Sequence, residues 1–287
     1  MSEPIATAGP LGAAAPGPPV TVVTVVRNAR ATIEATLESV RSQTHRPLDH
    51  LVLDGASTDG TLDVLRRAGG IRFESAPDDG IYDAMNRAID RIDRRESYVF
   101  FLNADDRFVA PEAVARVMAH SWGADFVHCL LERRDDALRY RDVVGGAIAL
   151  HDLVLRNRCG HQMIFARRSL FDRVGRFDRR FRIAADYDWV IRVFQRPELT
   201  KRFVPEVCAS MGAGGVSDQR YLRLLAERRR IVRERFGKAD EARFLAFAAA
   251  FELPGLAARR LLDGVGLLRA ARVVRRALRG GPRAPAR

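Results

Sequence analysis

The sequence predicts an α/β protein in which a mostly parallel β-sheet is flanked by helices. Two observations carry this prediction. Apolar runs of strand length recur between residues 20 and 103, and segments with apolar residues at helical spacing lie between them. Strands that alternate with helices in this way form parallel sheets that are covered on both sides. The apolar share of 47% over 287 residues also argues against disorder and allows a sizeable core.

The first half of the chain contains the alternation. Residues 20–26 (VTVVTVV) are a continuous β-branched run, which is typical of a strand buried on both faces. A helix is expected at 31–43, where Ile33, Leu37 and Val40 recur at helical spacing. The same alternation then predicts a strand at 50–54, a turn into a helix at 58–68, a strand at 71–75, a helix at 81–92 and a strand at 98–103.

The pattern in the second half of the sequence predicts a less regular arrangement of strands and helices. Strands are expected at 124–132 and 161–168, a helix is expected around 184–194, and the pattern after residue 218 is helical. Residues 1–19 are rich in Ala, Gly and Pro without periodicity, which is typical of a flexible tail. The sequence therefore predicts three parts: the tail at 1–19, a domain at 20–218 and a basic helical extension at 219–287.

The formal net charge of +12 lies in the extension. Residues 219–287 contain 18 basic and 6 acidic residues, whereas the remainder contains 30 of each. Within 256–279 a cationic and an apolar stripe at helical spacing suit an anionic membrane surface, and a helix packed on its own domain is the alternative. No aromatic stacking platform accompanies the arginines, so no nucleic acid is expected. The stripes are Arg269, Arg272, Arg276 and Arg279, and Leu267, Ala271, Val274 and Leu278.

The sequence shows no sign of secretion or membrane insertion. No stretch approaches the roughly 18 to 20 apolar residues that span a bilayer, and the N-terminus lacks the pattern of a signal peptide. Cys129, Cys159 and Cys208 show neither metal-ligand spacing nor a disulfide framework. We therefore expect a cytoplasmic protein, peripheral on the inner face of the plasma membrane where the basic extension binds lipid.

Polar residues follow three of the predicted strands, at 27–28, 54–55 and 103–106. Because ligands bind beyond the carboxyl ends of parallel strands, these residues are expected to converge on one crevice. Asp54 ends its strand and is a candidate to accept hydrogen bonds from a base or ribose. Turn and cap chemistry is the alternative for this loop, and it is expected of Ser57, Thr58 or Asp59.

The stretch FLNADDRF (101–108) places Asp105 and Asp106 side by side after an apolar strand. Neighbouring carboxylates repel each other unless a cation lies between them. Mg²⁺ or Mn²⁺ would accept carboxylate oxygens here and keep positions open for a substrate diphosphate. Such a cation would also stabilise charge on a phosphate leaving group. Loop caps or solvated charges are the alternative.

The stretch AADYDW (184–189) contains two further carboxylates. On a helix, Asp186 and Asp188 point in nearly opposite directions and cannot serve one site. Asp188 is expected to form a surface ion pair with Arg192, four residues on. Asp186 shares its side with Trp189 and is expected to face inward, where a carboxylate can act as a general base.

Six stretches together resemble the family 2 glycosyltransferases of the GT-A fold, and most closely bacterial enzymes that build surface polysaccharides and glycolipids. They are VTVVTVVRNA, LDGASTDGT, GIYDAMNRAI, FLNADD, FDRRFRIAADYDW and GGVS, in the family's order over about residues 20–218. The resemblance implies an inverting enzyme that moves a sugar from a nucleotide-sugar donor (UDP, GDP or dTDP) to a hydroxyl acceptor. The expected acceptor is a glycan or a lipid-linked precursor.

The resemblance implies roles on the donor side. Asp54 would bind the nucleotide base, and Asn28 and Asn86 also belong to the implied nucleotide site. For Asn86, an exposed position on an amphipathic helix is the alternative. Asn103-Ala104-Asp105 takes the place of the Asp-x-Asp motif, so Asn103 would lie at the nucleotide. Asp105 would coordinate Mg²⁺ or Mn²⁺ at the diphosphate, with Asp106 beside it.

The resemblance also implies roles on the acceptor side. Asp186 takes the place of the catalytic base that deprotonates the acceptor hydroxyl. His161 and Gln162 stand where acceptor contacts lie in the family, and a structural histidine is the alternative. Gly214 and Gly215 are expected in a mobile loop that closes over the diphosphate.

Two residues depart from the family pattern. Asn103 replaces the first Asp of the motif, and Ala185 replaces the usual Glu before the base. Because of Asn103, a catalytically silent nucleotide-sugar-binding or membrane-scaffold protein is the alternative to an enzyme. A dinucleotide-dependent oxidoreductase is not expected, because VVRNARATIE stands where a G-x-G-x-x-G turn would follow the first strand.

Overall fold

The computed structural model describes residues 17–121, 123–135, 140–156, 159–212, 220–254 and 256. The strands are β1 (Val20–Val26), β2 (Leu48–Asp54), β3 (Arg72–Ser75), β4 (Tyr98–Phe101), β5 (Arg107–Phe108), β6 (Phe126–Asp135), β7 (Tyr140–Val144), β8 (Ile164–Arg167) and β9 (Lys201–Gly212). The α-helices are α1 (Ile33–Arg41), α2 (Thr61–Arg67), α3 (Ile81–Asp90), α4 (Ala113–Ala119), α5 (Asp152–Leu155), α6 (Leu170–Val174), α7 (Ala185–Phe194), α9 (Tyr221–Phe236) and α10 (Lys238–Phe247). A 3₁₀ turn, η1 (His161–Met163), and a π-helical turn, η2 (Ala248–Glu252), complete the elements.

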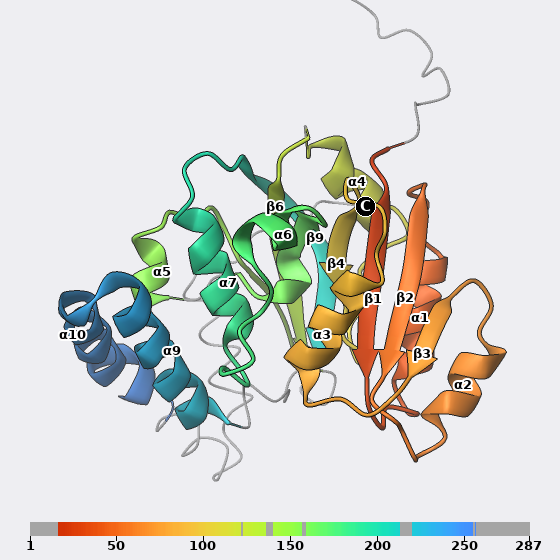
Figure 1. The fold of residues 1–287 in the computed structure, drawn as a ribbon, viewed down its shortest axis with the longest axis horizontal. Helices are drawn as coiled ribbons and strands as arrows, with labels where there is room; N and C mark the ends of the chain where they lie inside the picture. The colour runs from red at the N-terminus through yellow and green to blue at the C-terminus, as the bar shows by residue number, and fades with distance from the viewer. Residues whose placement is uncertain are drawn as a thin grey trace, which may run out of the picture.

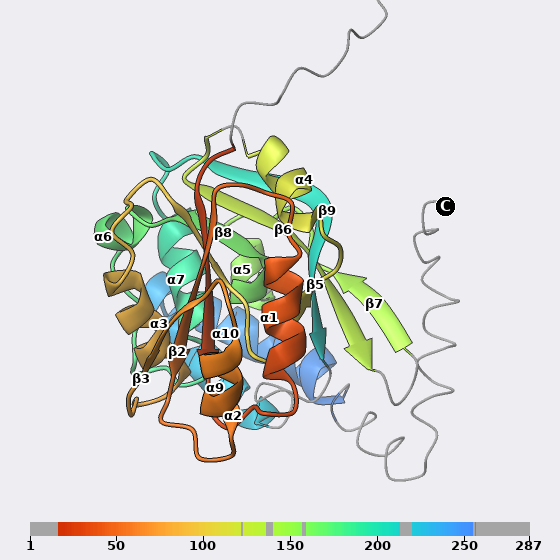
Figure 2. The same ribbon diagram turned by 90° about the vertical axis from the view of Figure 1, so that its right-hand side faces the viewer.

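The strands form one mixed sheet in the order β3-β2-β1-β4-β8-β6-β9-β5, with β7 paired to β6. The first four of these strands run in parallel, and β8 joins them to β6 through antiparallel pairs. Figures 1 and 2 show α1 on one face of the sheet and α3 on the other. The predicted α/β arrangement is therefore confirmed.

The core between the sheet and α7 is aromatic. Trp189 of α7 stacks on Phe171 of α6 with ring centroids 4.5 Å apart, and its indole nitrogen donates to the carbonyl of Gly175 at 2.8 Å. Phe126 of β6 packs against the same indole at 6.2 Å. Because Trp189 is fully buried among these rings, α7 is fixed in rotation, and this decides where its carboxylates point.

The second half of the sheet differs from the prediction in several places, and strands β5 and β7 were not predicted. His161 begins the 3₁₀ turn η1 instead of a strand, and β8 starts only at Ile164. The long strand β9 was not predicted, because Pro205 and three charged residues interrupt its apolar pattern. Its pairing with β6 slips around Pro205, where a residue without an N–H cannot continue the ladder.

The prediction of helices after residue 218 is confirmed for α9, α10 and η2. Helix α9 packs against α7, and α10 packs against α5 (Figure 1). Arginines in these helices form ion pairs with the domain, such as Arg235 of α9 with Asp188 of α7 at 2.7 Å, so this part of the extension lies on its own domain. The two stripes at 267–279 lie outside the described residues. Within the described ranges, no helix combines the length and the apolar character needed to cross a membrane.

Candidate functional site

The carboxyl ends of β1, β2 and β4 lie at one edge of the sheet. Val26 pairs with Asp54 across β1 and β2, and Val23 pairs with Phe101 across β1 and β4. The loops that follow these strands carry all three of the predicted polar stretches. The structure therefore brings residues 28, 54 and 103–106 to the same edge, as parallel pairing requires.

Asp54 is buried, with 2% of its surface exposed, and organises the loop that follows β2. Its carboxylate accepts hydrogen bonds from the Ser57 backbone N–H at 2.9 Å, from the Ser57 hydroxyl and from the Ser75 hydroxyl at 2.7 Å. Three donors hold this carboxylate in one orientation at the end of the strand. Its contact with a nucleotide base stays a prediction.

Asn28 ties the end of β1 to the same loop. Its backbone N–H donates to the Ser57 hydroxyl at 2.8 Å, and its Oδ1 accepts from the Thr58 N–H at 2.8 Å. Asn28 has a left-handed φ of 53°, which asparagine tolerates better than most residues. The two adjacent strand ends thus form one hydrogen-bonded platform.

The neighbouring carboxylates of Asp105 and Asp106 have opposite environments. Asp105 is exposed, while Asp106 is buried, with 1% of its surface exposed. One oxygen of Asp106 accepts from Gln162 Nε2 at 3.2 Å, and the other, Oδ1, has no hydrogen-bond partner among the described residues. Burial and the adjacent charge of Asp105 raise the pKa of Asp106 to about 7.

This arrangement fits one mode of divalent-cation binding. Among the described residues, no group of three or more His, Cys, Asp or Glu side chains could hold a metal. Mg²⁺ is, however, commonly held by one or two carboxylates together with substrate phosphates. The exposed carboxylate of Asp105 fits that mode, in which the diphosphate supplies the remaining oxygens.

Asp106→Asn is expected to remove a pH-dependent loss of stability in metal-free protein. The native carboxyl holds its proton up to about pH 7, whereas the unfolded carboxyl releases it near 3.8. The native state therefore binds more protons between these values, so its stability falls as pH rises, by at most about 4 kcal/mol. Urea unfolding in EDTA at pH 5 and pH 8 should show a smaller fall for the variant. An equal fall in both proteins would contradict the assignment.

Asp186 is the centre of a hydrogen-bonded group that joins α7 to the strand-end motif. Its Oδ2 accepts from Nδ1–H of His161 at 3.0 Å and from the His161 backbone N–H at 3.3 Å. Its Oδ1 accepts from the Tyr82 hydroxyl at 3.1 Å and from the Tyr187 N–H at 2.8 Å. The second ring nitrogen of His161 lies 3.2 Å from Oδ1 of Asn103. Asp186 thus faces inward, as predicted.

Tyr82 is a member of this group that was not predicted as a site residue. Its single O–H is shared between Oδ1 of Asp186 and the carbonyl of Ile183, which lies 2.8 Å from the hydroxyl oxygen. Burial, together with the charge of Asp186, raises the pKa of Tyr82 well above its ordinary value, so the hydroxyl stays a donor. The sequence placed Tyr82 on the helix at 81–92, but no pattern links it to a residue 104 positions away.

Asn86 lies one turn further along α3 and is already engaged. Its amide nitrogen donates to the Phe177 carbonyl at 2.9 Å, and its amide oxygen accepts from the Phe177 N–H at 3.0 Å. The alternative of a merely exposed Asn86 is wrong, because the residue is half-buried. Since both polar atoms serve the backbone, we leave Asn86 out of the donor site proposed below. Gly214 and Gly215 lie outside the described residues.

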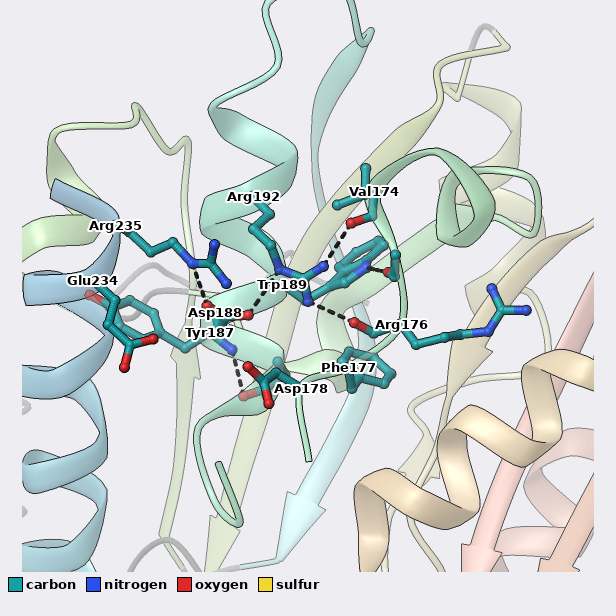
Figure 3. A network of polar contacts seen from close by, with 12 residues as sticks. Val174, Arg176, Phe177, Asp178, Tyr187, Asp188, Trp189, Arg192, Glu234 and Arg235 are labelled. Carbon is teal, nitrogen blue, oxygen red and sulfur yellow. Dashed lines mark hydrogen bonds and ion pairs between the residues drawn. The ribbon is translucent and has the colours of Figure 1, made fainter. Parts of the chain in front are cut away.

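Asp188 pairs with Arg192 as predicted, at 2.9 Å, but the prediction of a surface pair is wrong. The Asp188 side chain is 0% exposed, and its second oxygen accepts from Arg235 of α9 at 2.7 Å (Figure 3). Arg192 also donates to the carbonyls of Val174 and Arg176. The packing of α9 over α7 therefore converts an expected surface pair into a buried triad.

Comparison with known proteins gives a consistent result. Residues 21–143 match the family model described as Glycosyl transferase family 2. The chain is 33% identical to the PGL/p-HBAD biosynthesis glycosyltransferase of Mycobacterium bovis over 215 residues, which are 70% of this chain and 80% of the relative. It is 37% identical to the putative teichuronic acid biosynthesis glycosyltransferase TuaG of Bacillus subtilis over 98 residues, which are 32% of this chain and 37% of the relative.

Solved structures share the fold at low sequence identity. The crystal structure of S. aureus TarS 1-349 in complex with UDP-GlcNAc has a TM-score of 0.56 and 14% identity, over 81% of this chain and 73% of that chain. The mannosyltransferase PcManGT from Pyrobaculum calidifontis, in complex with GDP-Man and Mn²⁺, has a TM-score of 0.55 and 19% identity, over 90% and 85%. At these identities the likeness establishes the fold.

Proposed function

The chain belongs to glycosyl transferase family 2, and on that premise we propose that it is an inverting, metal-assisted enzyme with Asp186 as its base. It is a glycosyltransferase of the GT-A fold that takes its sugar from a nucleotide-sugar donor. In the proposed reaction, Asp186 takes the proton of an acceptor hydroxyl, and the oxygen attacks the anomeric carbon in line. The glycosidic bond forms as the bond to the phosphate oxygen breaks, and the nucleoside diphosphate leaves.

The observation that carries the proposal is the chain of polar contacts from Asn103 through His161 to Asp186, in which Nδ1–H of His161 donates to Asp186 and Nε2 lies 3.2 Å from the Asn103 side-chain amide. Asn103 opens the stretch that we assign to the donor, and Asp186 is the carboxylate that we assign to the acceptor. A general base must lie within reach of the reacting group. One imidazole ring between the two residues supports a reaction centre at this point of the sheet edge.

The donor side is proposed to consist of the strand-end residues. Asp54 and Asn28, held by the loop at 57–58, would contact the nucleoside, and Asn103 would lie next to the sugar diphosphate. Asp105 would hold Mg²⁺ or Mn²⁺, with Asp106 behind it. When bound, such a cation neutralises the charge that grows on the leaving diphosphate.

The acceptor is proposed to be a lipid-linked or cell-surface glycan precursor. Support comes from the relatives, one named for PGL/p-HBAD biosynthesis and one for teichuronic acid biosynthesis. His161 and Gln162 would border the acceptor, and a loop with Gly214 and Gly215 would close the site. The arginines within 256–279 are proposed to bring the enzyme to an anionic membrane surface.

A thermal-shift panel of UDP, GDP, dTDP and NAD⁺, each with Mn²⁺ or with EDTA, tests the donor site. One nucleoside diphosphate is expected to stabilise the protein only with Mn²⁺. At 100 times its Kd this gives about 2.7 kcal/mol, which corresponds to a rise in Tm of about 5–10 °C. Stabilisation by NAD⁺ alone would overturn the proposal.

Asp105→Ala is expected to abolish the Mn²⁺-dependent part of this shift and to reduce sugar transfer by about 10²-fold, since it removes the charge that holds the cation. Asp93→Ala is the control, because Asp93 is also exposed but lies before β4, at the opposite edge of the sheet. Transfer at the unchanged rate in Asp105→Ala would show that this carboxylate holds no essential metal. A silent binding protein would show no transfer in any variant, including the unaltered chain.

A further inference from the structure

We propose that Glu227 of α9 is a positioning residue for Asp186, so that the C-terminal extension is part of the catalytic unit. This inference rests on the proposed function of Asp186 as the base. The sequence predicted a basic helical extension at 219–287, and for 256–279 either a membrane surface or packing on the domain. The structure places α9, the first helix of this extension, directly against the helix that carries the proposed base (Figure 1).

Helix α7 begins without a cap of its own. Its N-cap residue is Ala184, whose side chain makes no cap hydrogen bond, and the next residue is Ala185. Glu227 supplies the missing acceptor from another element. Its Oε2 accepts from the Ile183 N–H at 2.8 Å and from the Ala184 N–H at 3.1 Å. A carboxylate at a helix N-terminus is favoured by the helix dipole, and bonds to an ionised acceptor are stronger than neutral ones.

The carboxylate of Glu227 is itself well held. Its side chain is 11% exposed, and its other oxygen pairs with Arg223 at 3.2 Å. Little solvent therefore competes for the two backbone N–H groups. Arg235, two turns further along α9, binds the first turn of α7 through Asp188 at 2.7 Å. Helix α9 thus contacts the start of α7 on both sides of Asp186, through Glu227 at residues 183–184 and through Arg235 at Asp188.

The contact at Ile183 reaches Asp186 through Tyr82. The Ile183 N–H is held by Glu227, and its carbonyl accepts from the Tyr82 hydroxyl at 2.8 Å. The same O–H is shared with Oδ1 of Asp186, which lies 3.1 Å from the hydroxyl oxygen. Loss of Glu227 leaves the 183–184 backbone without its acceptor, so the Tyr82 contact and the Asp186 carboxylate shift together. A displacement of about 1 Å at a reacting group can cost about 10²-fold in rate.

Three variants of Glu227 and one matched control test the inference. Glu227→Ala removes the acceptor, and kcat is expected to fall about 10- to 100-fold while the donor KM stays within about twofold. Glu227→Gln keeps one oxygen that can accept both N–H groups, so kcat should stay within about threefold of the parent. Glu234→Gln is the control, because Glu234 lies on the same helix in ion pairs with Arg180 and Arg230, away from residues 183–184.

Glu227→Asp covers the case in which Glu227→Ala does not fold. It keeps the charge but withdraws the carboxylate by one methylene, and a loss of kcat at an unchanged Tm is expected. Unchanged kcat in Glu227→Asp and Glu227→Ala, or an equal loss in Glu234→Gln, would overturn the inference. The inference would also be overturned if the loss of kcat in a Glu227 variant merely matched the loss of folded protein in that variant. If the parent chain itself transfers no sugar, the proposed function is refuted instead. Donor binding is therefore measured for the parent and for every variant, so that failure of the proposed function can be told apart from failure of the Glu227 inference.

Discussion

Asp186→Asn is expected to reduce turnover about 10²- to 10⁴-fold, the range for loss of a positioned general base, with donor binding unchanged. The carboxamide has nearly the shape of the carboxylate, but its nitrogen cannot accept a proton. Asp186 accepts four hydrogen bonds. They come from the Tyr82 hydroxyl, the Tyr187 backbone N–H, the His161 backbone N–H and the His161 ring Nδ1–H. These bonds hold the carboxylate as an acceptor, so the substitution removes its chemistry while the fold around it is kept by the Trp189 core.

The measurement pairs single-turnover sugar transfer with calorimetric titration of the nucleoside diphosphate. Asp63→Asn is the matched control, because that residue lies on α2 with 61% of its side chain exposed. Turnover close to that of the parent would place the base elsewhere. Loss of donor affinity together with turnover would make Asp186 a structural residue of the donor site, since a base acts only on the acceptor proton.

The N-terminal half of the fold could be predicted because its signals are local. The β-branched run at 20–26 is β1 to the residue, and the helix expected at 31–43 is α1, Ile33–Arg41. Each such strand or helix is encoded by its own spacing of apolar residues. Strand β9 shows the limit, because its pairing with β6 and β5 depends on partners far away in the sequence.

The candidate site also contains residues that local sequence patterns indicated and residues that only the packing of distant helices reveals. Asp54, Asn103 and Asp186 could be found from the sequence because each follows a strand or lies within a motif of several residues. Tyr82 and Glu227 could not, because their contacts with residues 183–186 form only when α3 and α9 pack against α7. Local spacing predicts which residues belong to an element, but it does not predict which distant helix covers that element.

Asp188→Ala is expected to destabilise the protein by about 3–5 kcal/mol, because it leaves two guanidinium groups without their shared carboxylate. Asp188 is 0% exposed, and it pairs with Arg192 at 2.9 Å and with Arg235 at 2.7 Å (Figure 3). Burial lowers the pKa of Arg192, which Asp188 opposes, but a guanidinium does not lose its proton in a protein. The uncompensated charge must therefore be hydrated, which weakens the contact between α9 and α7.

Urea unfolding of Asp188→Ala beside Asp63→Ala checks this result. Asp63 also forms an ion pair within one helix, with Arg66 at 3.2 Å, but both side chains are more than half exposed. An exposed pair of this kind contributes about 0–1 kcal/mol. Equal, small losses in both variants would show that Asp188 is solvated in solution and that α9 does not cover it. A large loss confined to Asp188→Ala would show that the C-terminal helices are a structural part of the domain.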